Sequence, residues 1–237
     1  MTISKSKYAL ALIFLLFVSH PDSFARHQNS QSTKKQTTFK RILFFGNSLT
    51  AGYGLDLSLA FPNLIQQKID SLGWHFVAVN AGLSGETSAG GYRRIDWLLR
   101  QPVAALVLEL GGNDALRGID QTVTKRNLQG IINKTRDKYP DVKIVIAGML
   151  VPPNFGQTYA RQFRDLFPAL ADTNQAYLIP FLLAGVGGSP QLNQPDGIHP
   201  TAKGHRIIAE NVWQVLRPVL AKMNPIQKSA TESTESH

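Results

Sequence analysis

Ser48 is the first residue whose type and position suggest chemistry. It follows Gly46 and Asn47 at the end of the apolar run Ile42–Phe45, where a turn out of a strand would present its hydroxyl above a sheet. Backbone N–H groups of such a turn point toward an oxygen held there. Ser48 could instead be the N-cap of the next helix, which is the commoner role for a serine at such a position. Taken alone, the residue leaves the nucleophile and the cap as alternatives.

Asp196 and His199 lie three residues apart in the sequence DGIHP. At this spacing a carboxylate can hold one ring nitrogen of the histidine and select its tautomer. His205, on the predicted helix that follows, has no acid at a comparable spacing. Asp196 and His199 could also bind a metal ion, but no further ligand cluster lies nearby. The pair therefore favours a general base with its orienting acid.

Two glycine-containing segments could contact a bound ligand. Asn113 follows two glycines after the apolar run Val103–Leu110, and its carboxamide is a neutral donor suited to an oxyanion. The loop Gly82–Thr87 contains Gly85, where the backbone can approach a ligand closely. Either segment could instead be an ordinary turn. Glu109 is unusual within an apolar run, and a buried carboxylate with satisfied hydrogen bonds or a position at the strand edge explains it better than a catalytic role.

The segments between these residues alternate between strand-like and helical patterns. Four of the five apolar runs are nearly continuous, as in parallel strands covered on both faces. The alternation predicts an α/β fold: a three-layer α/β/α sandwich with a mainly parallel five-stranded sheet and functional loops at the carboxyl ends of strands. The predicted strands are Ile42–Phe45, Phe76–Val79, Val103–Leu110, Val142–Ala147 and Ala176–Ile179, and the predicted helices cover about 60–72, 88–100, 122–138, 158–174 and 201–222.

Together, the four polar segments resemble the SGNH (GDSL-type) hydrolase family. Its blocks have counterparts, in the same order, in FFGNSLTAGYG, NAGLSGETSAGG, LELGGNDALRG and DGIHP. The likeness runs from about residue 41 to 217 and is greatest to exported bacterial arylesterases and the acyl-CoA thioesterase I/lysophospholipase group. It implies the flavodoxin-like SGNH hydrolase fold. One position departs from the family, because Asn47 stands where an aspartate outside the triad is usual.

The resemblance implies a role for each candidate residue. Ser48 would be the nucleophile, His199 the general base and then acid, and Asp196 the group that orients His199. The oxyanion hole would consist of the Ser48 and Gly85 backbone N–H groups and the Asn113 side chain. The chain lacks the G-x-S-x-G elbow of α/β hydrolases and the Walker A and dinucleotide fingerprints.

The expected activity is hydrolysis of a small-molecule ester or thioester through an acyl-enzyme, with no metal and no cofactor. Aryl esters, short-to-medium acyl esters and lysophospholipids are the expected substrates. The alternative is a noncatalytic module that binds an acyl or glycan group on the same fold. Loops 149–158 and 183–198 follow strands and should border the cleft, where five apolar side chains could contact the substrate: Leu150, Val151, Phe155, Leu192 and Ile198.

Composition excludes several other classes of protein. A length of 237 residues fits one domain, and 43% hydrophobic with 17% charged residues rules out a wholly disordered chain. The net charge is +9, but about half of the excess lies on the polar residues 26–40, so we expect no nucleic-acid partner. The absence of cysteine excludes disulfide scaffolds, thiolate metal sites and a lipid anchor on cysteine.

The N-terminus has the pattern of an export signal. Lys5 and Lys7 precede the apolar run Ala9–Val18, which is too short to cross a bilayer, and Ser23-Phe24-Ala25 offers small residues for cleavage. An uncleaved membrane anchor is the alternative. We expect an exported protein, periplasmic or secreted, without a stable membrane anchor. The expected organisation is a signal peptide (1–25), a polar flexible linker (26–39), the hydrolase domain (40–223) and a disordered tail (224–237).

Overall fold

A five-stranded sheet lies at the centre of the structure, a computed structural model that describes residues 39–151 and 153–224. Every strand pair is parallel, and the strand order is β2-β1-β3-β4-β5. The predicted signal peptide, nearly all of the linker and nearly all of the tail lie outside the described residues. The strands are β1 (Lys40–Gly46), β2 (Phe76–Gly82), β3 (Ala105–Glu109), β4 (Lys143–Ala147) and β5 (Tyr177–Ile179).

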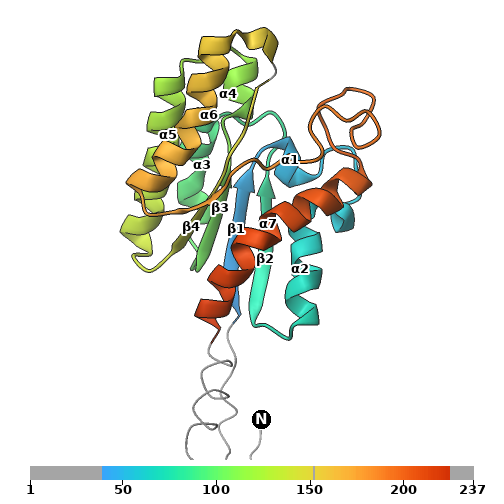
Figure 1. The fold of residues 1–237 in the computed structure, drawn as a ribbon. Helices are drawn as coiled ribbons and strands as arrows, with labels where there is room; N and C mark the ends of the chain where they lie inside the picture. The colour runs from blue at the N-terminus through green and yellow to red at the C-terminus, as the bar shows by residue number, and fades with distance from the viewer. Residues whose placement is uncertain (1–38, 152, 225–237) are drawn as a thin grey trace, which may run out of the picture. The chain divides into compact units, whose positions relative to one another are not determined.

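Helices cover both faces of this sheet and produce the predicted three layers. Helices α3, α5 and α6 lie along one face, and α2 and α7 pack together on the other (Figure 1). No helix in residues 39–151 or 153–224 is both long and apolar enough to cross a membrane. The helices are α1 (Ser48–Ala51), α2 (Phe61–Ser71), α3 (Ser88–Leu98), α4 (Gly112–Leu116), α5 (Gln121–Lys138), α6 (Gln157–Thr173) and α7 (Ala202–Met223), with 3-10 turns η1 (Leu57–Leu59) and η2 (Pro153–Phe155).

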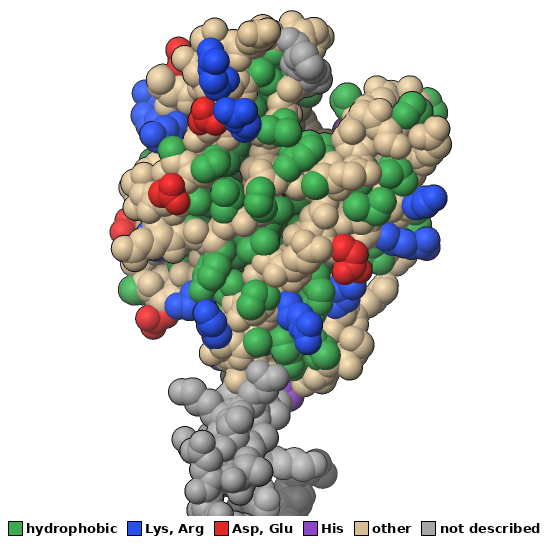
Figure 2. Space-filling model, viewed as in Figure 1, with side chains coloured by type: hydrophobic (Ala, Val, Ile, Leu, Met, Phe, Trp, Pro, Cys, Tyr) green, Lys and Arg blue, Asp and Glu red, His purple; other side chains and the backbone are tan. Residues whose placement is uncertain are grey.

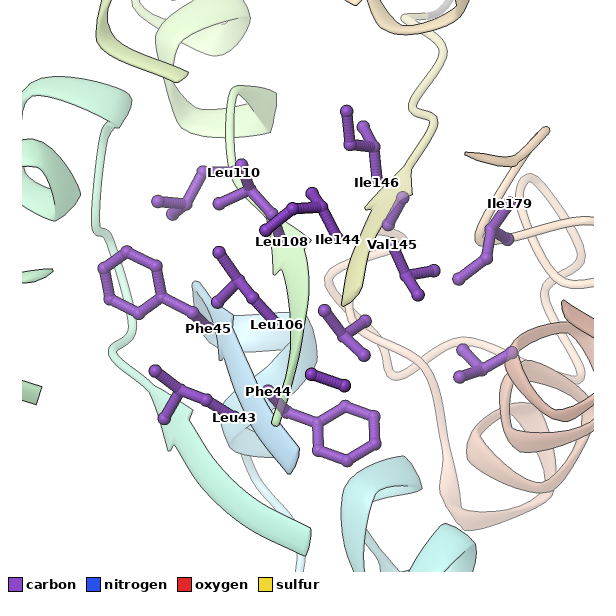
Figure 3. Packing of buried hydrophobic residues seen from close by; sticks show 14 of the residues in the cluster. Leu43, Phe44, Phe45, Leu106, Leu108, Leu110, Ile144, Val145, Ile146 and Ile179 are labelled. Atoms are coloured by element: carbon purple, nitrogen blue, oxygen red, sulfur yellow. The ribbon is translucent and has the colours of Figure 1, made fainter. Parts of the chain in front are cut away.

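The central strands are buried on both faces because their side chains alternate between the two helical layers. Leu43 and Phe45 point to one side of β1 and Phe44 points to the other (Figure 3), and all three are at most 1% exposed. Burying a side chain of this size contributes about 1.5–3 kcal/mol. The residues that follow β1 and β3 therefore start from a rigid platform.

The strand order also places a crevice at the carboxyl end of the sheet. The chain leaves β1 toward β2 on one side, and all later strands lie on the other side of β1. Loops after β1 and β3 therefore diverge, and such a switch point is where parallel α/β sheets bind ligands. Ser48 follows β1 and Asn113 follows β3, so both lie at this point.

Candidate active site

The structure brings Ser48, His199 and Asp196 together at the carboxyl end of the sheet. Ser48 begins α1 directly after β1, and its Oγ lies 3.0 Å from His199 Nε2. His199 Nδ1 lies 2.7 Å from Asp196 Oδ2. All three predicted residues thus form one hydrogen-bonded chain.

Ser48 is not the N-cap of the helix it begins. Asn47 caps α1, because its Oδ1 accepts a hydrogen bond of 3.0 Å from the Leu49 backbone N–H. The cap interpretation of Ser48 is therefore wrong, and the serine hydroxyl faces His199 Nε2 at 3.0 Å, with Asn47 Oδ1 3.4 Å away. Satisfying this N–H with the neighbouring side chain stabilises a helix too short to be stable alone.

The loop before α7 holds Asp196 and His199 as one unit. Asp196 Oδ1 accepts hydrogen bonds of 3.0 Å from the backbone N–H groups of both His199 and Ile198. The bonds from the His199 backbone and ring, followed by that from Ile198, lower the pKa of Asp196 to about 2. The carboxylate is therefore ionised near neutral pH and accepts from His199 Nδ1–H. A neutral imidazole in this tautomer presents its lone pair at Nε2, toward Ser48.

Tyr53 packs against the ring of His199, a contact that the sequence does not predict. The two ring centroids are 4.5 Å apart, with planes inclined by 38°. The Tyr53 backbone oxygen accepts a 2.7 Å hydrogen bond from Gln194 Nε2, which ties the segment after α1 to the histidine loop. The clue in the sequence is the position of this aromatic residue in the same block as Ser48, SLTAGY.

The three predicted oxyanion donors border one cleft. Ser48, Gly85 and Asn113 all line it, and within the described residues neither backbone N–H, of Ser48 or of Gly85, donates to another protein group. Asn113 Nδ2 donates to the Glu86 backbone oxygen at 3.0 Å. This bond uses one amide hydrogen and leaves the second for a ligand.

An ion pair between Arg94 and Glu86 fixes the loop that contains Gly85. Arg94 of α3 contacts Glu86, with Nε 2.9 Å from Oε1, and also donates to the Ala81 backbone oxygen at 2.8 Å. At the start of the loop, Gly82 passes so close to α1 that a Cβ would overlap the α1 backbone. These contacts fix the position of the loop relative to Ser48.

The cleft beside these groups has a volume of about 580 Å³ and a mostly apolar wall. In Figure 2 the surface is hollowed at this end, between the lobe of α4 and α6 and the loop after β5. Three of the five predicted contact residues, Leu150, Val151 and Ile198, line it. The other two do not: Phe155 stacks on Tyr159 instead, and Leu192 packs against the core. The remaining apolar lining consists of Leu49, Tyr53, Leu116, Met149, Phe181 and Leu183.

Ionisable residues elsewhere do not assemble a metal site in the part of the chain that the structure describes. Among residues 39–151 and 153–224, no group of three His, Asp or Glu side chains could hold a metal ion. Glu109 is fully buried and accepts hydrogen bonds from Asn47 and Thr50. The interpretation of Glu109 as a satisfied buried carboxylate is therefore confirmed.

Comparison with known proteins identifies the family. Residues 44–207 match the GDSL-like Lipase/Acylhydrolase family. The chain belongs to this family. The resemblance drawn from the four sequence blocks is thereby confirmed, and so is the expectation of an enzyme that acts on carboxylic esters. Nothing in the comparisons favours a noncatalytic binding module.

Individual relatives align over most of the chain. Esterase TesA of Pseudomonas aeruginosa is 38% identical over 187 residues, covering 78% of this chain and 92% of the relative. An arylesterase of Vibrio mimicus is 36% identical over 178 residues (75% and 88%). Thioesterase 1/protease 1/lysophospholipase L1 of Escherichia coli K12 is 36% identical over 180 residues (76% and 84%). A crystal structure of TesA superposes with a TM-score of 0.72 at 39% identity, covering 76% of this chain and 99% of that one.

Proposed function

We propose that this GDSL-like hydrolase is a serine esterase that cleaves aryl and short-to-medium acyl esters, and thioesters, through an acyl-enzyme. The observation that carries the proposal is the chain of hydrogen bonds from Asp196 through His199 to Ser48. It ends on a hydroxyl that faces an apolar cleft lined by backbone and amide donors. This arrangement can activate a serine and bind an oxyanion.

In the acylation step, Ser48 Oγ attacks the substrate carbonyl carbon while His199 Nε2 takes the hydroxyl proton. The carbonyl oxygen becomes an oxyanion, which the Ser48 and Gly85 backbone N–H groups and the Asn113 amide stabilise. Asp196 stabilises the imidazolium that forms. When the intermediate collapses, the alcohol or thiol leaves with the proton from His199 Nε2, and the acyl group remains on Ser48.

Deacylation repeats the same steps with water as the nucleophile. His199 takes a proton from the water molecule, which attacks the acyl carbonyl carbon, and the second oxyanion uses the same donors. Collapse releases the carboxylic acid and returns the proton to Ser48 Oγ. In this scheme His199 carries out every proton transfer. The Ser48 and Gly85 backbone N–H groups and the Asn113 side chain donate the hydrogen bonds to both oxyanions.

The apolar wall of the cleft supports a hydrophobic acyl or aryl group in the substrate. Leu116, Met149, Leu150 and Phe181 line it, and each buried methylene contributes about 0.8 kcal/mol. The names of the relatives add aryl esters, thioesters and lysophospholipids as candidate substrates. A lysophospholipid would place its single acyl chain on this wall and its ester at Ser48.

A fluorophosphonate probe tests the proposal, because only an activated serine reacts with it. We expect one label, located on Ser48 by peptide mass spectrometry, and none in Ser48→Ala or His199→Ala. Ser84→Ala is the matched control, since Ser84 is an exposed serine of the same cleft and should leave the labelling at Ser48. Labelling that survives Ser48→Ala would contradict the assignment.

We also infer that the protein is exported to the periplasm or secreted. The support is the sequence pattern of residues 1–25, which lie outside the described residues. Expression in a Gram-negative host, followed by fractionation and N-terminal sequencing, should yield a mature chain that begins at Arg26. A full-length chain retained in the membrane fraction would favour the uncleaved anchor.

A further inference from the structure

Glu109 and Asn47 lie directly behind the turn that carries Ser48, and neither takes part in the mechanism above. Glu109 is the last residue of β3 and has no exposed surface. Asn47 is 3% exposed and precedes Ser48. We propose that Glu109, together with Asn47, is a positioning residue that holds the nucleophile turn in its productive geometry. The proposal rests on the proposed role of Ser48.

The hydrogen bonds of Glu109 reach the turn on both sides of the serine. Before Ser48, Glu109 Oε2 accepts from the Asn47 backbone N–H at 3.1 Å, and Oε1 accepts from Asn47 Nδ2 at 2.7 Å. After Ser48, Oε2 accepts from Thr50 Oγ1 at 2.8 Å. The carboxyl group therefore links the two ends of the turn through three donors.

The backbone of the turn packs directly on this carboxyl group. Gly46 pairs with Glu109 in the parallel register of β1 and β3. A Cβ at Gly46 would overlap both Glu109 Oε2 and Thr50 Oγ1, so the glycine is what allows the approach. Displacing the carboxyl group would leave buried donors without a partner, which is costly.

The Asn47 side chain connects Glu109 to the backbone of the turn that carries Ser48. Its Nδ2 donates to Glu109, and its Oδ1 accepts from the Leu49 backbone N–H at 3.0 Å. The amide orientation is therefore determined at both ends. An error of about 1 Å in the position of a reacting group can cost roughly 100-fold in rate, so this link bears directly on turnover.

Residue 47 is asparagine where the family usually has aspartate, and this difference determines which side chain donates in the hydrogen bond between Asn47 and Glu109. With asparagine, every hydrogen-bond partner of Glu109 is a donor, an arrangement that suits the carboxylate present above neutral pH. Within the described residues the Glu109 carboxyl forms no ion pair, and the only other ionisable side chain hydrogen-bonded to the turn is His199, through Ser48 Oγ. An aspartate at position 47 would place a second carboxyl group against Glu109 and would require a shared proton.

Exchanging donor and acceptor tests the pair. In E109Q the Gln amide nitrogen would face Asn47 Nδ2, donor against donor, so we expect kcat to fall about ten-fold or more with KM within about two-fold.

N47D should lose kcat as the pH rises above neutral and the shared proton dissociates. In N47D/E109Q the Gln nitrogen would donate to the carboxylate that the N47D change introduces, while the Gln oxygen keeps the other two bonds. We expect the double variant to recover most of kcat and to lose the alkaline decline.

A matched pair of threonine substitutions controls for the loss of a buried hydroxyl. Thr50 and Thr135 are both fully buried, but Thr135 donates within α5 to the Ile131 backbone oxygen. Thr50→Val should lower kcat, whereas Thr135→Val should change stability and leave kcat unaffected. All variants are compared by circular dichroism and by their urea midpoints.

The outcomes separate this proposal from the proposed function. If wild type hydrolyses esters and folded E109Q matches it in kcat, the positioning role is overturned and the esterase stands. A folded double variant no more active than E109Q would also overturn it. If E109Q does not fold, the N47D pH profile decides, and a profile identical to wild type refutes the pair. If the wild-type protein shows neither fluorophosphonate labelling nor ester turnover, both proposals are overturned.

Discussion

Lowering the pH from 6.5 to 4 should destabilise the protein through His205, a residue of α7. The residue is 1% exposed, and its Nδ1 accepts a 3.2 Å hydrogen bond from the Phe61 backbone N–H at the start of α2. Its ring also stacks on Phe61, with centroids 6.3 Å apart. Burial lowers the pKa of His205 to about 4. The folded state therefore holds a neutral imidazole, since a protonated Nδ1 could not accept this bond.

The magnitude follows from the separation of the two pKa values. The pKa of His205 is 6.5 in the unfolded chain and about 4 in the folded chain. Between these pH values the unfolded state binds more protons, so the free energy of unfolding decreases as the pH decreases. At about 1.4 kcal/mol per pH unit, the loss is about 3 kcal/mol.

Glu109 acts in the opposite direction over nearly the same range. Burial raises its pKa from 4.5 to about 7, so the folded state holds the extra proton and stability falls as the pH rises from 4.5 to 7. The magnitude is again about 3 kcal/mol. The two contributions oppose each other between pH 4.5 and 6.5, so the wild-type curve alone would conceal the effect of His205.

His205→Asn isolates the histidine, because an asparagine oxygen can accept the Phe61 N–H and does not titrate. Urea unfolding of both proteins would be followed by circular dichroism and tryptophan fluorescence from pH 4 to 7.5. The free energy of unfolding of wild type, relative to the variant, should fall by about 3 kcal/mol from pH 6.5 to 4. Glu109 is present in both proteins and cancels in this difference. Parallel pH curves would refute the reasoning, whatever their vertical offset.

Three predictions concern catalysis. Asn113→Ala should lower kcat by about 100- to 1000-fold with little change in KM, since the oxyanion bond strengthens in the transition state; a change confined to KM would make Asn113 a binding residue. Tyr53→Phe should retain kcat, whereas Tyr53→Leu should lower it about five-fold, because the ring face favours the imidazolium of His199; equal rates would contradict this. p-Nitrophenyl esters from acetate to palmitate should show graded rates without a jump at the concentration where the ester aggregates, and a sharp jump would argue against an open cleft.

The architecture could be predicted because burial on both faces leaves a strong pattern in the sequence. The run Val142–Ala147 corresponds to β4, and the segment 201–222 corresponds to α7, with ends shifted by one residue. The short helices α1 and α4 were not predicted, because four or five residues are too few to show a helical period. Their geometry depends on caps and on neighbouring strands.

The residues of the candidate site could be predicted individually, but the contacts among them could not. The roles suggested for Ser48 and His199 came from residue types next to predicted turns and from the family blocks. The packing of Tyr53 on His199 joins residues distant in sequence, and the bonds between Asn47 and Glu109 do the same. Such contacts depend on which strands become neighbours. Phe155 failed as a cleft residue for a related reason, since its ring stacks on Tyr159 of α6.

The strand order suits the protein to use as a split reporter, in which two separate fragments regain activity when they assemble. The neighbouring strands β2, β1 and β3 all precede the exposed Gly118, and β4 and β5 follow it. Ser48 and the oxyanion donors belong to the first fragment, whereas Asp196 and His199 belong to the second. A chain divided at Gly118 would separate the nucleophile from its base, so neither fragment could turn over an ester alone. Hydrolysis of a chromogenic substrate would return only when β4 pairs again with β3, and its rate would measure how often two fused partners meet.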